Sequence, residues 1–374
     1  MVDYDKDLKK YIDSLSAPNI AIIGLTGVGK SSLINGMFGI EIAPSGAGLP
    51  VTTKYEKYSP SAFDINLPVN LYDSPGYEPG KGQEQFVQET IDFLKEKKHL
   101  GGKEQIHLIW YLINASTARL TEADKEILEQ VNQNHIPAII VLSKSDIAEP
   151  HDREKVKNAI RENKFSKFDE IVEVAAKPLY SINGKPICEP YGMKDLVDLT
   201  MKELPTIYAD AFLVAQTVDI ESKKELAWKY VREASWACFA AGALPIPLTA
   251  PGSAISALGY MYGQIIALYG HSNHSLLLLV SGMTFGGFLT LVTEGVLDLF
   301  SPIFTGLSIL TGASAATFTA ISGKAFTETC ERLAKKELTG SEIEITEQLR
   351  KIFQEEFRKC SNLRISHPND LKKF

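Results

Sequence analysis

The sequence G-L-T-G-V-G-K-S at residues 24–31 is the feature that most limits what this chain can fold into. It follows the apolar run 19–23 and precedes the helix-like segment 32–38, so it has the strand and the helix that a P-loop requires. Glycine reaches positive φ angles, which lets such a loop wrap its backbone N–H groups around the α- and β-phosphates of a nucleotide. The motif therefore predicts a nucleotide-binding α/β domain.

Two side chains at the end of this loop have predicted roles of their own. We expect Lys30 to reach the β- and γ-phosphates and Ser31 to bind Mg²⁺. The N-terminus of the following helix adds a favourable partial positive charge. The residues expected to bind the nucleotide here are Gly24, Thr26, Gly27, Val28, Gly29, Lys30, Ser31 and Ser32.

From Asn19 to about Leu204, apolar strands alternate with polar helical stretches, which is typical of a doubly wound α/β domain with a mostly parallel sheet. In such sheets, ligands bind at the carboxyl ends of the strands. Strands are predicted near 19–24, 54–59, 68–73, 105–113, 137–143 and 170–175, and helices over 30–38, 84–98, 121–134, 152–163 and 192–203.

The loops after the early strands carry candidate phosphate and metal contacts. In the D-x-x-G sequence at 73–76, Asp73 is expected to hold Mg²⁺ through water, and the Gly76 N–H is expected to face the γ-phosphate. Between this motif and the P-loop, we favour Thr52 as a further Mg²⁺ ligand, with Thr53 as the alternative. A plainer interpretation is that both threonines begin a strand, where β-branched residues are common.

The base is predicted by S-K-S-D at residues 143–146. The Asp146 carboxylate can accept hydrogen bonds from guanine N1 and N2, a donor pair that adenine lacks, and an unsatisfied buried carboxylate would reject the wrong base. Lys144 is expected to lie along the base, and the Ala176 backbone N–H to approach guanine O6. The expected base-binding residues are Ser143, Lys144, Asp146, Ala175, Ala176 and Lys177.

The ordered series GLTGVGKSS, PVTT, DSPG, SKSD and VAAK resembles an Era-like small GTPase domain over residues 17–205. The P-loop sequence is also similar to that of septins and immunity-related GTPases, and residues 107–116 resemble the fourth strand of those families. The resemblance implies hydrolysis of GTP to GDP with Mg²⁺. The catalytic residues that it implies are Lys30, Thr52, Asp73 and Gly76.

Two positions depart from related patterns. Tyr77 stands where Ras-like proteins have a water-orienting glutamine, and Gly27 stands where potassium-activated relatives of Era have an asparagine. Because of Tyr77, we expect slow intrinsic hydrolysis unless a second chain, another loop or a partner completes the site. A homodimer across the nucleotide face is one such arrangement. Because of Gly27, a potassium-dependent mechanism is not expected.

Composition limits the partners and the compartment. The formal charge is −7, and no basic module follows residue 205, so nucleic acid is not expected as a partner. The 4 cysteines are far apart and form no C-x-x-C pair, which favours a reducing compartment. The chain starts without a basic and then apolar signal sequence, so a cytoplasmic location is expected.

The composition changes sharply after Pro205. Between residues 236 and 323 the only charged side chains, with His counted as neutral, are Glu294 and Asp298, although 23% of the whole chain is charged. Prolines and polar loops divide this stretch into the pieces 236–270, 275–293 and 302–323. The middle piece contains G-x-x-x-G and, as a helix, would be about 28 Å long, close to the thickness of a bilayer core.

Two interpretations of the apolar stretch stay open. It dips into a membrane as a helical pair, with its basic flanks on the cytoplasmic face, or it is the buried core of a soluble helical bundle. Parts of it resemble a helical domain of unknown function that bacteria fuse to Era-like GTPases. The tail is predicted to form helices at 324–337 and 341–359, and residues 3–15 to form a short amphipathic helix.

The sequence thus predicts a doubly wound α/β P-loop GTPase domain followed by an all-α helical domain. The expected boundaries are an N-terminal helix at 1–16, the GTPase domain at 17–205 and the helical domain at 206–374. The favoured function is a guanine-nucleotide switch that associates with membrane lipid through the helical domain, by self-association of the immunity-related or dynamin-like kind. The alternative is a soluble regulatory GTPase that binds a protein or ribosomal partner.

Overall fold

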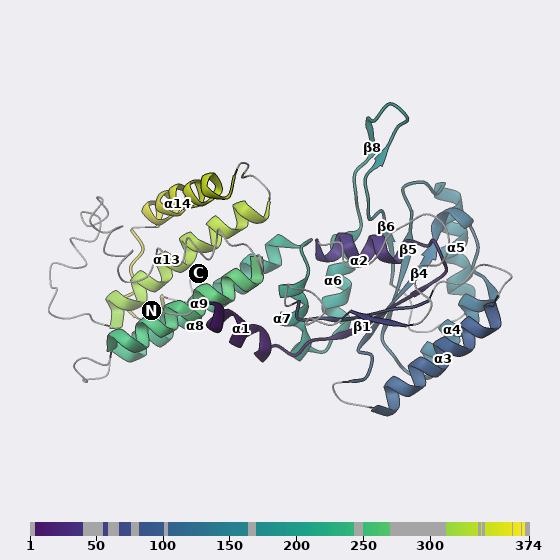
Figure 1. Cartoon of the computed structure of the whole chain (residues 1–374), viewed down its shortest axis with the longest axis horizontal. Helices are drawn as coiled ribbons and strands as arrows, with labels where there is room; N and C mark the ends of the chain where they lie inside the picture. The colour runs from purple at the N-terminus through teal and green to yellow at the C-terminus, as the bar shows by residue number, and fades with distance from the viewer. Residues whose placement is uncertain are drawn as a thin grey trace. The chain divides into compact units, whose positions relative to one another are not determined.

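The chain folds into two compact units (Figure 1). The computed structural model describes residues 4–39, 55–58, 67–75, 82–100, 104–163, 170–242, 250–269, 312–335, 338, 341–360, 362–367 and 369–370. The first unit, called the sheet unit here, comprises Leu15–Asp219. The second, called the helical unit, combines Met1–Ser14 with Ile220–Phe374.

The sheet unit is built on a six-stranded sheet in the order β2-β3-β1-β4-β5-β6. All neighbouring strands are parallel except β2, which runs antiparallel to β3. The strands are β1 (Asn19–Gly24), β2 (Glu56–Tyr58), β3 (Asn70–Asp73), β4 (Leu108–Asn114), β5 (Ala138–Ser143) and β6 (Ile171–Val174). This arrangement confirms the predicted α/β fold, with a mixed sheet.

Helices cover both faces of the sheet, which is why its strands read as nearly continuous apolar runs. Ile20 and Ile22 of β1 lie in one core, whereas Ala21 and Ile23 lie in the other. The first core is closed by α2 (Lys30–Phe38), α6 (Met193–Glu203) and α7 (Thr206–Ala215). The second is closed by α3 (Gln83–Leu100), α4 (Glu122–Gln133) and α5 (Pro150–Glu162).

The sheet unit continues beyond Pro205, where the composition changes. Phe212 and Ala215 of α7 are buried in the first core, and the Thr217 backbone N–H donates to the Met37 carbonyl of α2 over 2.9 Å. The compact unit therefore ends at Asp219.

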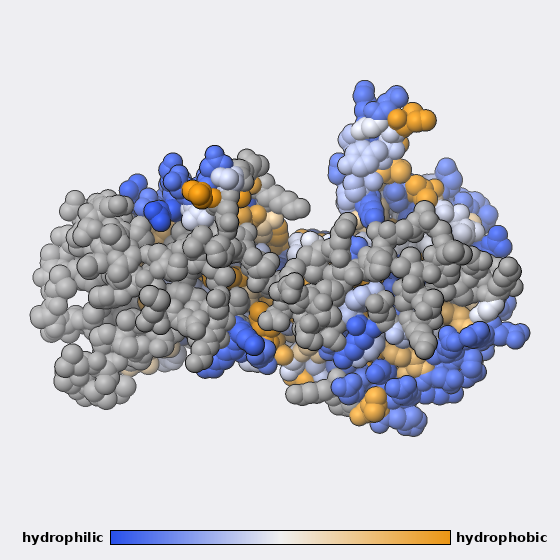
Figure 2. All heavy atoms as spheres, viewed as in Figure 1, coloured by the Kyte–Doolittle hydropathy of each residue, from blue (hydrophilic) through white to orange (hydrophobic). Residues whose placement is uncertain are grey.

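A β-hairpin that the sequence did not predict projects from the sheet unit (Figure 1). It consists of β7 (Leu179–Tyr180) and β8 (Pro186–Cys188), which pair antiparallel. Figure 2 shows hydrophobic residues on its surface, and the exposed apolar side chains are Tyr180, Ile182 and Ile187. The strands are too short to show the alternation by which strands are recognised in a sequence.

Both ends of the chain contribute to the helical unit. Its described helices are α1 (Tyr4–Ser14), α8 (Ile220–Gly242), α9 (Ala250–Tyr269), α13 (Gly312–Ala334) and α14 (Glu342–Lys359). The hydroxyl groups of Tyr11 and Tyr230 are hydrogen-bonded, and the Tyr11 ring meets the Tyr230 and Tyr260 rings edge-on. The N-terminal helix therefore belongs to the same core as residues more than two hundred positions later.

The apolar helices of this unit pack closely on one another. A Cβ at Gly323 of α13 would lie 2.7 Å from Val231 Cγ2 of α8 and 2.8 Å from Met261 Sδ of α9, so a glycine is required for the helices to approach this closely. Residues 312–323 of the third apolar piece and the first predicted tail helix lie in one continuous helix, α13. Among the described helices, none has the length and apolar character needed to cross a membrane.

Much of the apolar stretch falls outside the described residues. This applies to the middle piece 275–293, to 302–311 of the third piece, and to Glu294 and Asp298. The choice between a membrane hairpin and a buried core therefore stays open for them.

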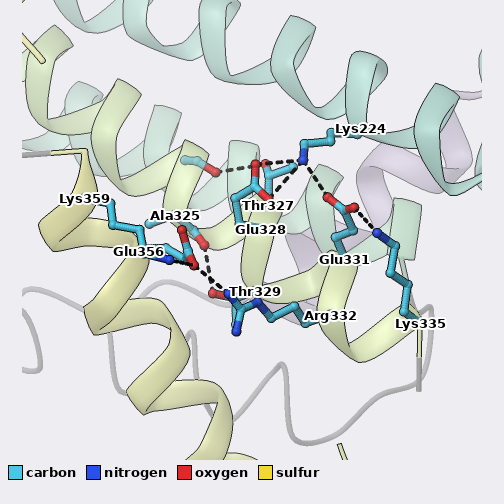
Figure 3. Close-up of polar contacts among 11 residues, drawn as sticks. Lys224, Ala325, Thr327, Glu328, Thr329, Glu331, Arg332, Lys335, Glu356 and Lys359 are labelled. Carbon is cyan, nitrogen blue, oxygen red and sulfur yellow. Dashed lines mark hydrogen bonds and ion pairs between the residues drawn. The ribbon is translucent and has the colours of Figure 1, made fainter. Parts of the chain in front are cut away.

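Ion pairs join the polar side of the helical unit (Figure 3). Lys224 Nζ of α8 lies 2.8 Å from Glu328 Oε1 and 2.8 Å from Glu331 Oε2 of α13. Burial by itself would raise the pKa of Glu331, but its hydrogen bonds to Lys224 and Lys335 outweigh burial and hold that pKa below its usual value. A second group joins α13 to α14 through Arg332, Glu356 and Lys359.

The N-terminus of α6 offers a test of the sheet unit. Gly192 has φ +77°, and a Cβ there would lie 1.8 Å from the Glu173 carbonyl oxygen. We expect Gly192→Ala to lower the free energy of unfolding by about 2–4 kcal/mol, because it combines backbone strain with a clash. Gly184→Ala in the hairpin turn is the control, since its φ is +72° but nothing lies within 4 Å. Equal losses in denaturant unfolding would contradict the clash.

The ion pairs of Lys224 predict a pH dependence. Because the pKa of Glu331 is lower in the folded than in the unfolded chain, the ionised carboxylate stabilises the fold. This stabilisation is fully present above the unfolded carboxyl pKa of about 4.3 and is lost as the pH falls through the folded pKa. We expect Lys224→Ala to lower the free energy of unfolding by about 2 kcal/mol at pH 7. Between pH 7 and pH 3, the free energy of unfolding should fall less in this variant than in the wild type. Denaturant unfolding at pH 7 and pH 3 measures both, with the exposed Lys351→Ala as control. An equal fall in the free energy of unfolding in the variant and the wild type would rule out the contribution of the Lys224–Glu331 pair.

Candidate nucleotide-binding site

The predicted motifs follow strands whose carboxyl ends lie side by side. In the sheet register, Ile22 pairs with Asp73, Gly24 with Leu112, Asn114 with Ser143, and Ser143 with Val174. The P-loop, the D-x-x-G motif and the two predicted base loops therefore open at the same edge of the sheet. This is the edge where parallel α/β sheets bind ligands.

The P-loop backbone has the conformation of a cradle. Gly27 has φ +72° and Gly29 has φ +105°, and a Cβ at either position would meet no atom of the described chain within 4 Å. Gly24 has a different role, because a Cβ there would lie 2.7 Å from the Leu112 carbonyl oxygen of β4. Glycine is thus required by dihedral angle at two positions and by close packing at a third.

Lys30 begins α2 with its side chain folded over the loop. Its ammonium donates to the Gly24 carbonyl over 2.9 Å and to the Leu25 carbonyl over 3.4 Å. Burial lowers the pKa of Lys30, and the nearby charge of Asp73 opposes that change. Burial removes water from the Lys30 ammonium. A phosphate oxygen beside it would therefore stabilise its positive charge strongly.

The donor set suits a phosphate ester with Mg²⁺. Buried hydroxyls at Thr26 and Ser74 have no hydrogen-bond partner among the described residues, so polar contacts remain for a ligand to satisfy. The Asp73 carboxylate is buried beside Lys30, and Ser31 lies partly buried in the first turn of α2. Hydroxyl and carboxylate oxygens are ligands that Mg²⁺ prefers.

The residues expected around the γ-phosphate cannot be placed. Thr52, Thr53, Gly76 and Tyr77 lie outside the described residues. Their roles therefore stay predictions.

The first predicted base loop is tied to the P-loop. Ser143 Oγ at the end of β5 lies 2.7 Å from the Val28 carbonyl oxygen and 3.2 Å from the Ile113 carbonyl oxygen. Lys144 follows with φ +55°, a value uncommon for a non-glycine residue, and this turn leads to the partly exposed Asp146. A serine at the first motif position thus makes the bond that braces the phosphate loop.

The second predicted base loop follows β6. Ala175 exchanges backbone hydrogen bonds of 3.0 and 3.1 Å with Tyr191, which returns from the hairpin. Ala176 is partly buried, with its carbonyl near Gly36 of α2, and Lys177 is exposed. The loop is therefore fixed at its start and open to solvent at its end.

Three charged residues behind the base loops were not singled out by the sequence. Arg153 and Lys157 of α5 both pair with Glu173 of β6, at 3.4 Å and 2.6 Å. Their four-residue spacing on one helix face directly after the S-K-S-D motif is the signal that could have found them.

Comparison with known proteins bears on this geometry. Residues 19–144 match the family model described as 50S ribosome-binding GTPase. GTPase Era of Caldicellulosiruptor saccharolyticus is 30% identical over 188 residues, which cover 50% of this chain and 55% of that protein. Interferon-inducible GTPase 1 of Mus musculus is 28% identical over 244 residues, which cover 62% of this chain and 54% of that protein.

A third relative comes from the septins. Cell division control protein 10 of Saccharomyces cerevisiae is 27% identical over 175 residues, covering 40% of this chain and 53% of that protein. The chain thus spans about half the length of each of these relatives. With the P-loop, the Asp73 strand end and the Ser143 turn at one edge of the sheet, these matches show that residues 19–144 form an Era-like P-loop GTPase domain, with distant similarity to immunity-related and septin GTPases.

Proposed function

We propose that the chain is a guanine-nucleotide switch, which binds GTP with Mg²⁺, hydrolyses it to GDP and is coupled to the helical unit. The hydrogen bond of Ser143 to the Val28 carbonyl carries the proposal, because it joins the predicted base loop to the predicted phosphate loop. Such a bond would hold the base site and the phosphate site of a nucleotide at a fixed distance from each other.

Each residue of the edge would make a different contribution to that reaction. Lys30 would hold phosphate oxygens from a buried position, where a charge acts more strongly than in water. Ser31 and Asp73 would hold Mg²⁺, which when bound neutralises charge on the β- and γ-phosphate oxygens. Asp146 would select guanine, and Ala176 would add its backbone N–H.

Base selectivity is the direct test. We expect the wild-type chain to bind GDP and GTP at least about a hundredfold more tightly than ADP and ATP, because only guanine satisfies the Asp146 carboxylate. Asp146→Asn should exchange this preference for xanthine nucleotides, since an amide can donate to the extra carbonyl. Calorimetric titration with each nucleotide measures the change, with Asp152→Asn of α5 as control. Equal affinity of the wild type for ATP and GTP would remove the proposal.

We infer that hydrolysis needs a second chain, because Tyr77 occupies the position of the water-orienting glutamine. Turnover per molecule should then rise at least about tenfold when a dilute solution is concentrated beyond the dissociation constant of a dimer. Phosphate release measured across nanomolar to micromolar protein, beside sedimentation at the same concentrations, tests this. Fast turnover that stays constant across the series would show that one chain carries a complete site.

The favoured role of the helical unit is membrane association. The stretch 236–323, whose only charged side chains are Glu294 and Asp298, supports it. Flotation of the full chain with liposomes in GTP, GDP and nucleotide-free buffer tests this role, and we expect at least one state to float. No flotation in any state would leave the alternative, a soluble regulatory GTPase that binds a protein or ribosomal partner. The description of the matching family model, 50S ribosome-binding GTPase, supports a ribosomal partner.

A further inference from the structure

Arg153 links the two loops predicted to bind the base. Its Nη1 donates to the Ser145 carbonyl oxygen over 2.8 Å, and its Nε lies 3.4 Å from Glu173 Oε2. Ser145 is the residue directly before Asp146, and Glu173 lies two residues before Ala175. One planar guanidinium thus connects the backbone of the first loop to the strand that leads into the second.

Both ends of this bridge are held by further contacts. The Ser145 hydroxyl donates to the Leu142 carbonyl over 2.7 Å, and the Ser145 N–H donates to the Val174 carbonyl over 3.3 Å. Glu173 also accepts from Lys157, 2.6 Å away, and this hydrogen bond raises the pKa of Lys157. The bridge is therefore part of a connected group and not an isolated surface pair, which would contribute little.

The local sequence explains why Arg153 reaches both loops. Pro150 occupies the first position of α5, where its fixed φ suits the start of a helix and its missing N–H costs nothing. The helix therefore begins four residues after Asp146, and Arg153 falls in its first turn. From there the side chain, only 23% exposed, lies behind the loops.

We propose that Arg153 is a positioning residue for guanine specificity, holding Asp146 at a fixed distance from the Ala175–Ala176 loop. The proposal rests on the proposed guanine-nucleotide function. Discrimination by a carboxylate depends on its placement to within a fraction of an ångström, and the fork of Arg153 adds a side-chain contact to the two hydrogen bonds by which Ser145, the residue before it, is held. The phosphate loop has its own brace in Ser143, so loss of Arg153 should disturb base recognition more than phosphate binding.

Comparing GDP with IDP isolates this effect, because hypoxanthine lacks the exocyclic amino group that donates to Asp146. The wild type should prefer GDP to IDP by at least about tenfold, the usual effect of a hydrogen bond to a charged acceptor. In Arg153→Ala the preference should fall to about threefold or less, chiefly through weaker GDP binding. Arg153→Lys should also lower it, since a single ammonium cannot donate as a fork to both groups.

The matched control is Arg161→Ala, two turns further along the same helix, whose guanidinium bonds to Asn158 of that helix. It should keep the wild-type preference. Calorimetric titration of the full chain with GDP and with IDP in Mg²⁺ buffer gives both affinities, and thermal unfolding reports whether each variant is folded. If Arg153→Ala does not fold, Arg153→Lys and Glu173→Gln carry the test.

Two results separate this inference from the function beneath it. Equal weakening of GDP and IDP in the Arg153 and Glu173 variants, with the wild-type ratio kept, would overturn the positioning role and leave the guanine switch intact. A wild-type chain without preference for GDP over ADP would overturn the proposed function itself.

Discussion

The hydrogen bond between the Ser143 hydroxyl and the Val28 carbonyl is the contact on which the geometry of the site depends. Strand order brings the loops to one edge, but a sheet fixes only where each loop begins. A P-loop with two glycines at positive φ has little stiffness of its own. The serine holds the P-loop from the neighbouring loop, so one hydroxyl ties the predicted phosphate loop to the predicted base loop.

Much of the sheet unit could be predicted because its signals are local. Strands buried on both faces are continuous apolar runs, and the P-loop fixes the strand and the helix on either side of it. The hairpin at 179–188 gave no such signal, because each of its strands has only two or three residues and its side chains are largely exposed. Arg153 was missed because its role comes from contacts with Ser145 and Glu173, which the sequence does not place together.

The helical unit was harder to predict because its signals are ambiguous. An apolar, small-residue helix has the same composition whether protein or lipid surrounds it. In α13, Gly323 packs closely against α8 and α9, a contact that occurs in either surrounding. The ion pairs of Lys224 join the part of α8 before the apolar stretch to the part of α13 after it, and both parts have a mixed charge.

The contact between Tyr11 and Tyr230 joins α1 to a helix that is synthesised much later. A ribosome releases α1 first, and its apolar side chains then have no partner until α8 and α9 emerge, after the whole sheet unit. The sheet unit has its full set of strands by that point and can fold on its own, whereas the helical unit must close a long loop around a finished domain. During synthesis, the buried side chains Tyr11 and Ile12 of α1 therefore stay without their partners until α8 and α9 have emerged.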